Sequence, residues 1–264
     1  MRYPRIDTGR CIGCAACVEV CPSSQLCLED GVASPCRMVP RPCHGCGHCY
    51  AVCPEHAVSI WEDERELAQA NLEPEHWRIP LDTLSLFLQM RRSVRFFRKD
   101  PVDRALLESL LDRNRWAPTA CNRQEVGWIV LESPEARRQL AEAIAEWALQ
   151  SEGYRSIGEE YRRGHDTVLR GAPCVLLAHA PAGVATSILD CAIALEDMEL
   201  LLASAGLGSC WSGLATHMAA ERPDLVEFLG LDGTRQIFGG LMVGWPDVRF
   251  RRVPPRKTPS VLWR

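Results

Sequence analysis

A twelve-residue cysteine pattern occurs twice near the beginning of this 264-residue chain. Residues 11–22 read CIGCAACVEVCP and residues 43–54 read CHGCGHCYAVCP, so each copy has the spacing C-x2-C-x2-C-x3-C-P. A short segment so rich in cysteine, proline and glycine has few large apolar side chains and cannot bury enough surface to fold unaided. The first 60 residues therefore need help from disulfides or from a metal group.

The spacing of these cysteines favours iron–sulfur clusters. Thiolates two residues apart can converge on one cluster, because the turn between them points backbone N–H groups at the cluster sulfurs. In two-cluster ferredoxins the fourth cysteine, which precedes a proline, reaches away and ligates the other cluster. The sequence thus predicts two 4Fe–4S clusters with these ligands: Cys11, Cys14, Cys17 and Cys53 for one, and Cys43, Cys46, Cys49 and Cys21 for the other.

Zinc and structural thiols are the alternative uses of these cysteines. Zinc sites favour two separated C-x2-C pairs that close a tetrahedron, whereas here three closely spaced cysteines recur with a Cys-Pro end. Nearby residues that are not expected to be ligands are His44, His48, Cys27 and Cys36. Three cysteines farther along lie in or beside apolar stretches and are predicted to be buried thiols: Cys174, Cys191 and Cys210.

The composition indicates a soluble protein of a reducing compartment. The N-terminal MRYPRIDTGR has no apolar run that could serve as a signal peptide, and no stretch of about 20 apolar residues could span a membrane. Because disulfide frameworks belong to secreted proteins, the cysteines point to a cytoplasmic location. The formal net charge of −4 gives no reason to expect nucleic acid as a partner.

The change of composition along the chain predicts two domains. Residues 1–61 form the cysteine-rich one, and residues 1–60 resemble a bacterial-type ferredoxin with two 4Fe–4S clusters, which carries single electrons. Residues 62–80, which are charged and bounded by proline, are interpreted as a linker with a helical turn in EDERELAQA. From residue 81 to 264 cysteine becomes sparse and helical periodicity begins.

The second domain is predicted to be a layered α+β structure, in which helices alternate with a few strands. Helices are expected over residues 82–90, 103–116, 134–150, 152–169, 185–205 and 218–228. Strands are expected over residues 127–132, 174–180 and 237–245. The helix over 185–205 is apolar around most of its circumference, so it should lie in the centre of the domain or in a subunit interface.

Residues 90–97, MRRSVRFF, offer a place for a phosphate group. Arg91, Arg92, Ser93 and Arg95 supply three guanidinium groups and a hydroxyl within five residues, and arginine binds phosphate through charge-assisted hydrogen bonds. Taken alone, such a run is more often a solvated face. No G-x-G-x-x-G or G-x-x-x-x-G-K-S stretch supports a Rossmann or P-loop site.

Three later stretches accompany this run: WAPTACNRQ at 116–124, LASAGLGSCWSG at 202–213 and GWPDVRFRRVPPRK at 244–257. In this order they resemble the FMN-dependent nitroreductase family, so the whole chain is similar to a fusion of a ferredoxin with a nitroreductase-like α/β sandwich. The resemblance implies FMN as a cofactor and the following contacts: Arg91, Arg92, Ser93 and Arg95 on phosphate and ribityl groups; Pro118, Thr119 and Asn122 reaching the flavin of the second subunit; Trp211, Ser212 and Gly213 along the ring; and Arg256 and Lys257 closing over the phosphate.

The resemblance implies a flavin-dependent oxidoreductase. An external donor such as reduced ferredoxin would supply single electrons to the clusters, and FMN would pass them in pairs to a small organic acceptor such as a nitro compound or a quinone. No side chain is assigned as a catalytic acid or base. A homodimer, a cytoplasmic location and an anaerobic setting are expected.

Three other functions are weighed against this one. A diaphorase-like relay would hand the electrons to a partner protein, and a specific ene or imine reductase or a dehalogenase would act on one metabolite. A binding module without FMN is the third, but a clamp of arginines without a phosphate would hold like charges together with nothing to offset their repulsion.

Overall fold

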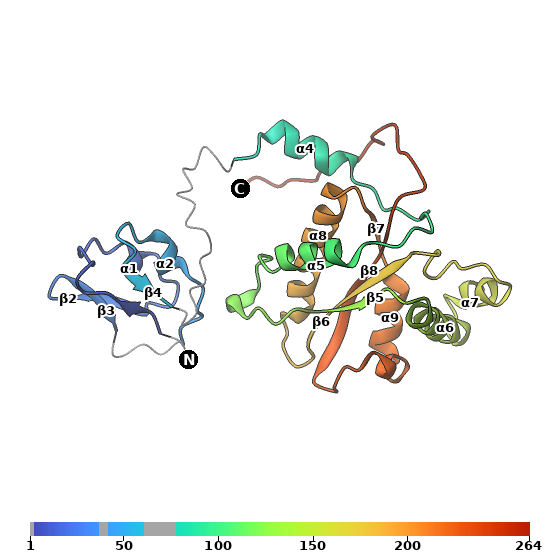
Figure 1. Cartoon of the computed structure of the whole chain (residues 1–264), viewed down its shortest axis with the longest axis horizontal. Helices are drawn as coiled ribbons and strands as arrows, with labels where there is room; N and C mark the ends of the chain where they lie inside the picture. Colours follow the sequence, from blue (N-terminus) through green and yellow to red (C-terminus); the bar gives the residue numbers. More distant parts are fainter. Residues whose placement is uncertain (1–2, 37–41, 61–77) are drawn as a thin grey trace. The chain divides into compact units, whose positions relative to one another are not determined.

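The computed structural model describes residues 3–36, 42–60 and 78–264. The chain forms two compact units (Figure 1). The first comprises residues 1–78 together with 120–123, and the second comprises residues 79–119 and 124–264. The helical turn predicted within residues 62–70 lies outside the described residues. Within the described part of the chain, no helix is both long and apolar enough to cross a membrane.

The first unit contains two short antiparallel strand pairs and two short helices. In chain order these are β1 (Arg5–Ile6), α1 (Ala16–Glu19), β2 (Leu26–Glu29), β3 (Val32–Pro35), α2 (His48–Val52) and β4 (Val58–Ser59). Strand β1 pairs with β4 and β2 pairs with β3, both antiparallel. Asp30 and Gly31 join β2 to β3 with φ of 51° and 79°, the two positive values that a type I′ hairpin turn requires.

The core of the first unit is small, as its composition predicts. Its buried side chains are Leu26, Ala33, Val58, Ile60, Cys17 and Cys49. Two of these six are cysteines of the repeated motif, so the apolar core and the cysteine sites share the same interior. Such a core is too small to stabilise the unit by burial alone, and a bound metal group would add to it.

The second unit is a four-stranded antiparallel sheet between helices. The sheet has the order β5-β6-β8-β7. Its strands are β5 (Gly127–Leu131), β6 (Cys174–Pro181), β7 (Gly208–Trp211) and β8 (Arg235–Gly244). The helices are α4 (Leu81–Met90), α5 (Arg104–Asn114), α6 (Pro134–Gln150), α7 (Arg155–Arg162), α8 (Ser187–Ser204) and α9 (Gly213–Glu221), with the 3-10 turn η2 (Pro223–Leu229). The 3-10 turn η1 (Ala120–Asn122) belongs to the first unit.

Both faces of this sheet are covered by helices (Figure 1). Val175 and Leu177 of β6 pack into the core that contains α6 and α9. Leu176 and Ala178, which alternate with them, pack into the core that contains α5 and α8. Because successive strand residues point to opposite faces, a strand buried on both sides must be apolar throughout, and this explains the continuous apolar run CVLLA.

Two helix ends lie where the sequence predicts them, and local caps explain both. Helix α6 begins after Ser133, whose Oγ accepts a hydrogen bond from the Ala136 N–H at 3.1 Å, and Pro134 is its first residue. Helix α8 ends before Gly206, which has φ of 79°, and the Leu207 N–H reaches back to the Leu202 carbonyl at 2.9 Å.

Three expectations for this unit were wrong. The helix expected over 152–169 is the shorter α7, because Gly164 (φ of 88°) ends it and the Asp166 carboxylate accepts hydrogen bonds from three later N–H groups. The helix expected over 218–228 is α9, which begins earlier at Gly213 and ends before Pro223. Strand β7 was not foreseen, because four residues after a glycine cap carry almost no periodicity.

We expect Leu140→Ala to lower the free energy of unfolding of the second unit by about 2–5 kcal/mol, because Leu140 is fully buried between α6 and the sheet and its removal leaves a cavity. Urea unfolding followed by tryptophan fluorescence would measure this, since six of the eight tryptophans lie at positions 116–263. The neighbouring exposed Gln139→Ala is the control and should change the value by no more than about 0.5 kcal/mol. Equal effects of the two variants would contradict this assignment of the core.

Candidate functional site

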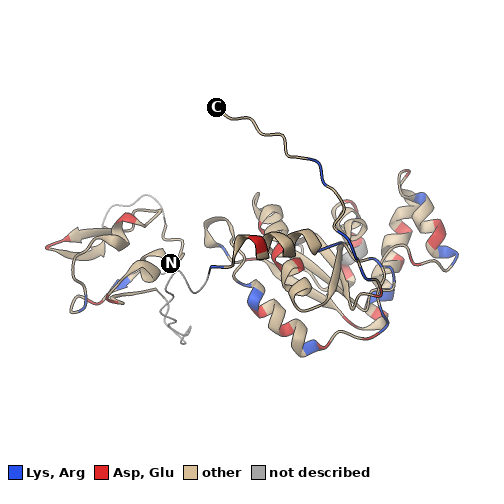
Figure 2. Cartoon of the chain, turned by 90° about the horizontal axis from the view of Figure 1, so that it is seen from above, with Lys and Arg blue, Asp and Glu red and all other residues tan. Residues whose placement is uncertain are grey.

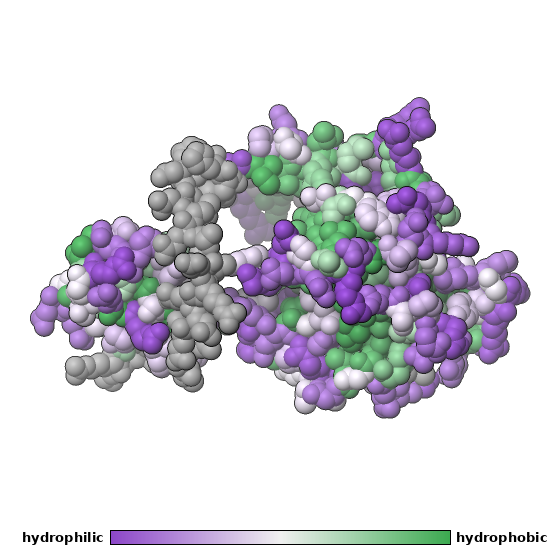
Figure 3. Space-filling model, in the orientation of Figure 1, coloured by the Kyte–Doolittle hydropathy of each residue, from purple (hydrophilic) through white to green (hydrophobic). Residues whose placement is uncertain are grey.

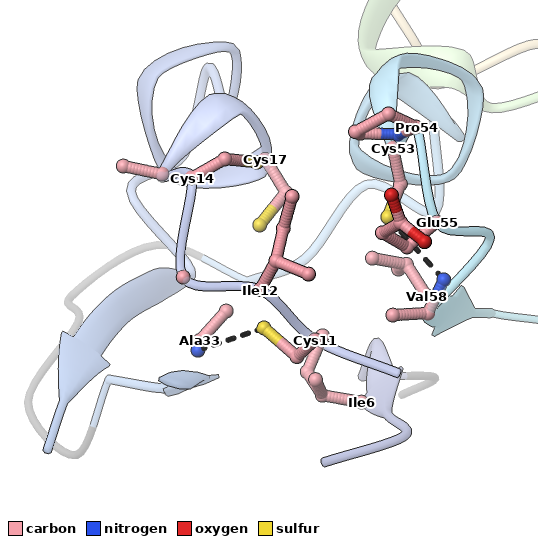
Figure 4. A pocket seen from close by; sticks show the side chains of 13 residues that line it. Ile6, Cys11, Ile12, Cys14, Cys17, Ala33, Cys53, Pro54, Glu55 and Val58 are labelled. Atoms are coloured by element: carbon pink, nitrogen blue, oxygen red, sulfur yellow. Dashed lines mark hydrogen bonds between the residues drawn. The ribbon is translucent and has the colours of Figure 1, made fainter. Parts of the chain in front are cut away.

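Four cysteines from both ends of the first unit line one small cavity. Its cysteine lining is Cys11, Cys14, Cys17 and Cys53, accompanied by apolar side chains such as Ile6 and Val58. Figure 4 shows the sulfurs of Cys11, Cys17 and Cys53 directed into the same space. These four are the set that the sequence assigns to one cluster, and the fourth of them comes from the second motif.

A second cavity is lined by the complementary set. Its cysteines are Cys21, Cys43, Cys46 and Cys49, and His44 and His48 also lie at its wall. Each motif therefore contributes three cysteines to one cavity and one to the other. Among the described residues, no group of three or more Cys, His, Asp or Glu side chains is placed to hold a single metal ion.

Backbone N–H groups point at the sulfurs in both cavities. The Ala57 N–H donates to Cys53 Sγ at 3.3 Å and the Ala33 N–H to Cys11 Sγ at 3.5 Å. In the second cavity the Gln25 N–H donates to Cys21 Sγ at 3.2 Å and the Gly45 N–H to Cys43 Sγ at 3.4 Å. N–H donors of this kind stabilise thiolate ligands and tune the potential of an iron–sulfur cluster. Thiol donors, apolar walls and N–H groups together fit such a group.

Burial acts against the thiolate form in the metal-free protein. It raises the pKa of the Cys17 thiol, and the nearby Cys53, Cys11 and Cys14 raise it further. Burial likewise raises the pKa of Cys49 to about 11. Because a metal binds thiolates, binding here must release protons from these groups.

Cys27 and Cys36 stand apart from the cavities. Neither is among the described residues that line them, and they lie on one face of the β2–β3 hairpin. A hydrogen bond that the Cys36 S–H donates to Cys27 is the main cause that raises the pKa of Cys36 to about 11. In the second unit the three predicted buried thiols are confirmed: Cys174, Cys191 and Cys210.

Two neighbouring arginines and a third one far along the sequence line one pocket of the second unit. Arg91 and Arg92 follow α4, and Arg256 belongs to the C-terminal segment. Ser85, Gln89 and Pro254 also contribute to the wall. Figure 2 shows basic residues in blue on the C-terminal segment, which is exposed and forms no helix or strand from residue 251 onward. Converging guanidinium groups beside hydroxyl and amide side chains fit a phosphate group.

The segment after Arg92 lies along strand β7. Ser93 forms a parallel bridge with Ser209, and the Val94 N–H donates to the Ser209 carbonyl at 2.8 Å. This pairing fixes the backbone beside the pocket to the sheet. Arg95 and Lys257 are exposed, and neither is among the described residues that line the pocket.

The end of β7 carries the predicted ring-facing residues. Trp211 is 38% exposed, and its indole Nε1 donates to Glu199 Oε2 at 2.9 Å. Ser212 is buried, and its Oγ has no partner among the described atoms, which is unusual for a buried hydroxyl. At Gly213, the first residue of α9, an added Cβ would meet nothing within 4 Å. Glu199 was missed by the sequence analysis, although an acid within the apolar stretch MELLLA was a signal.

The loop between α5 and β5 holds the remaining predicted residues. Thr119 Oγ1 accepts a hydrogen bond from the Gln124 N–H at 3.0 Å, and Pro118 is exposed. Asn122 has φ of 52° and, within the first unit, its Nδ2 donates to the carbonyl oxygens of Gly45 and His44 at 3.0 and 3.4 Å. A role of these three residues in flavin binding stays a prediction.

The end of this loop is fastened to the sheet by an arginine. Arg235 Nη2 donates to the Glu125 carbonyl at 2.5 Å, and its Nε donates to His179 Nδ1 at 2.7 Å. The second bond requires that the imidazole be neutral at Nδ1. Burial, followed by the Arg235 charge, lowers the pKa of His179 from its usual 6.5.

Both halves of the chain match known protein families. The pattern of the nitroreductase family matches residues 88–245, and that of a 4Fe-4S dicluster domain matches residues 3–54.

Solved structures resemble the second unit. A nitroreductase with bound FMN from Bacteroides fragilis is 19% identical, with a TM-score of 0.58 over 68% of this chain and 98% of its own. Another with bound FMN, from Desulfitobacterium hafniense, is 20% identical, with a TM-score of 0.58 over 69% and 100%. An FMN-dependent nitroreductase from Mycobacterium smegmatis, in complex with NADPH, is 22% identical, with a TM-score of 0.50 over 67% and 99%. At these identities the likeness shows the fold.

His179 makes the stability of the second unit depend on pH. Because its folded pKa lies below the unfolded value of 6.5, the unfolded chain binds the extra proton first, and stability falls as the pH drops below 6.5 toward the folded pKa. We expect His179→Gln to flatten this dependence between pH 7.5 and 5.5 in urea unfolding. The exposed His217→Gln is the control and should keep the slope of the wild type. An unchanged slope in His179→Gln would show that this imidazole is not the titrating group.

Proposed function

Because the chain belongs to the nitroreductase family and carries a domain of the 4Fe-4S dicluster type ahead of the matched region, we propose that it is an FMN-dependent oxidoreductase supplied with electrons by its own iron–sulfur domain. Two 4Fe–4S clusters accept single electrons from an external donor such as reduced ferredoxin. The final acceptor is a small organic molecule, such as a nitro compound or a quinone.

The observation that carries this proposal is the sorting of the eight motif cysteines into two sets of four around two cavities. A chain with one cluster would need only one such set. Cys11, Cys14, Cys17 and Cys53 would hold one cluster, and Cys21, Cys43, Cys46 and Cys49 the other. Because cluster ligands must stay reduced, we place the protein in the cytoplasm.

The basic pocket of the second unit would hold the phosphate of FMN. Arg91, Arg92 and Arg256 provide the charge, and Ser93 stands on the backbone segment that is bridged to β7. Trp211, Ser212 and Gly213 lie at the end of the same strand, where the ring of the flavin would follow its phosphate. When bound, FMN supplies the chemistry that joins one-electron delivery to two-electron reduction of the acceptor.

A relay to a partner protein is the second candidate function. The exposed loops around the cysteine cavities, where Cys14 is itself exposed, favour exchange of electrons with another protein. As a relay the chain would reduce every small acceptor slowly and a protein partner quickly. A specific ene or imine reductase or a dehalogenase would instead show one fast small-molecule acceptor.

A homodimer is part of this proposal. Helix α4 has no buried residue, and its apolar side chains are exposed: Leu81, Leu84, Leu86, Leu88 and Met90. Figure 3 shows the apolar colour gathered over this helix. Ile188 and Leu189 at the start of α8 and Trp263 in the C-terminal segment are also exposed. So many exposed apolar side chains are typical of a surface that another subunit covers.

We expect the anaerobically purified protein to contain about eight iron atoms per chain, since each 4Fe–4S cluster holds four. Iron and flavin analysis would measure this, with one FMN expected per chain. Two zinc atoms and no iron would reject the iron–sulfur assignment.

The electron route is tested by Cys14→Ala, with Cys27→Ala as the matched control outside both cavities. We expect Cys14→Ala to lower the rate at which reduced ferredoxin drives reduction of the acceptor at least tenfold. Reduction of the acceptor by chemically reduced protein should persist. Stopped-flow absorbance under anaerobic conditions would separate the two rates. Undisturbed ferredoxin-driven turnover in Cys14→Ala would refute the route through the clusters.

A further inference from the structure

A buried carboxylate lies directly behind the basic pocket. Glu199, on α8, is 2% exposed. Its Oε1 accepts a hydrogen bond from Ser209 Oγ at 2.9 Å and one from Arg91 Nη1 at 3.4 Å. Its Oε2 accepts the bond from Trp211 Nε1. Three donors from two separate segments thus meet on one side chain.

This arrangement is costly unless every partner is in place. A buried carboxylate must be compensated by donors, and removal of one partner leaves a charge or a polar group unsatisfied. Arginine and the indole of tryptophan can only donate, so each of them needs an acceptor atom on its partner. The site is therefore matched to an acceptor with two oxygens, and glutamine at position 199 would turn an N–H group toward one of these donors.

The three donors differ in how firmly the fold holds them in place. Ser209 and Trp211 lie two residues apart on β7, so they project from the same face of a strand that is paired with β8. Arg91 follows the end of α4, and its side chain is 22% exposed. A free arginine side chain has many rotamers, which must be restricted before it can bind a ligand in one geometry. The carboxylate is fixed by its hydrogen bonds to the strand, and it in turn restrains the arginine, which is the one flexible partner.

We propose that Glu199 is a positioning residue that fixes Arg91 for the phosphate of the flavin. The proposal rests on the proposed function, because it assumes that the pocket of Arg91, Arg92 and Arg256 binds that phosphate. One guanidinium nitrogen of Arg91 faces Glu199, and the planar fork leaves its other N–H groups for the ligand. Glu199 itself does not line the pocket among the described residues, so it acts through Arg91.

The test compares binding of FMN and of riboflavin, which lacks the phosphate, to flavin-free full-length protein by quenching of flavin fluorescence. Glu199→Gln keeps the volume of the side chain and removes its charge. Asp190→Asn is the matched control: it neutralises another buried carboxylate of α8, nine residues and about 13 Å away along the helix. A double-mutant cycle joins Glu199→Gln to Arg91→Ala.

We expect Glu199→Gln to weaken the binding of FMN at least tenfold and that of riboflavin by less than twofold. Asp190→Asn should change the binding of neither flavin. In the Arg91→Ala background, Glu199→Gln should weaken FMN binding by less than a further threefold, because its effect passes through the missing arginine. Unchanged or tighter FMN binding in Glu199→Gln, equal losses for both flavins, or independent effects in the cycle would each overturn the proposal.

A second pair of variants covers the case in which Glu199→Gln does not fold. Arg91→Lys keeps the charge but cannot contact Glu199 and a phosphate with a planar fork, so it should weaken FMN at least fivefold more than Arg92→Lys does. Equal losses in the two lysine variants would overturn the role of Glu199. A wild-type protein that binds neither flavin would instead refute the proposed function, whereas loss of FMN in Arg91→Ala but not in Glu199→Gln would reject the positioning role alone.

Discussion

The exchange of cysteines between the two motifs is the constraint on which the first unit depends. Each cavity takes three thiols from one motif and the fourth from the other, so neither cavity is complete until both motifs have come together. The core around them is small, and two of its six buried side chains are cysteines of the repeated motif. With the proposed clusters bound, folding of this unit and assembly of its metal sites would be one event.

In the second unit, the pocket depends on strand β7. It pairs with β8, it is bridged to the segment that carries Ser93, and through Glu199 it restrains Arg91. The pocket is consequently fixed from the sheet side by hydrogen bonds, while Arg256 approaches it on an exposed segment without regular structure.

Much of the fold could be predicted because its signals are local. Ser133 and Pro134 indicate the start of α6, and the apolar runs of β6 and β8 indicate buried strands. The predictions failed where a neighbour in space decided the outcome. Strand β7 exists because β8 and Ser93 lie beside it, and α7 is short because the Asp166 carboxylate captures the backbone that follows.

The sequence by itself indicated the two halves of the protein and the sorting of the motif cysteines into two sets, because a fixed spacing of thiols and a family pattern are properties of the chain alone. Only the tertiary structure decided that Arg91 is held by Glu199, 108 residues away. An acid in an apolar helix shows in the sequence, but its partners do not. A buried charge is satisfied by whichever donors the packing of helix and strand brings to it.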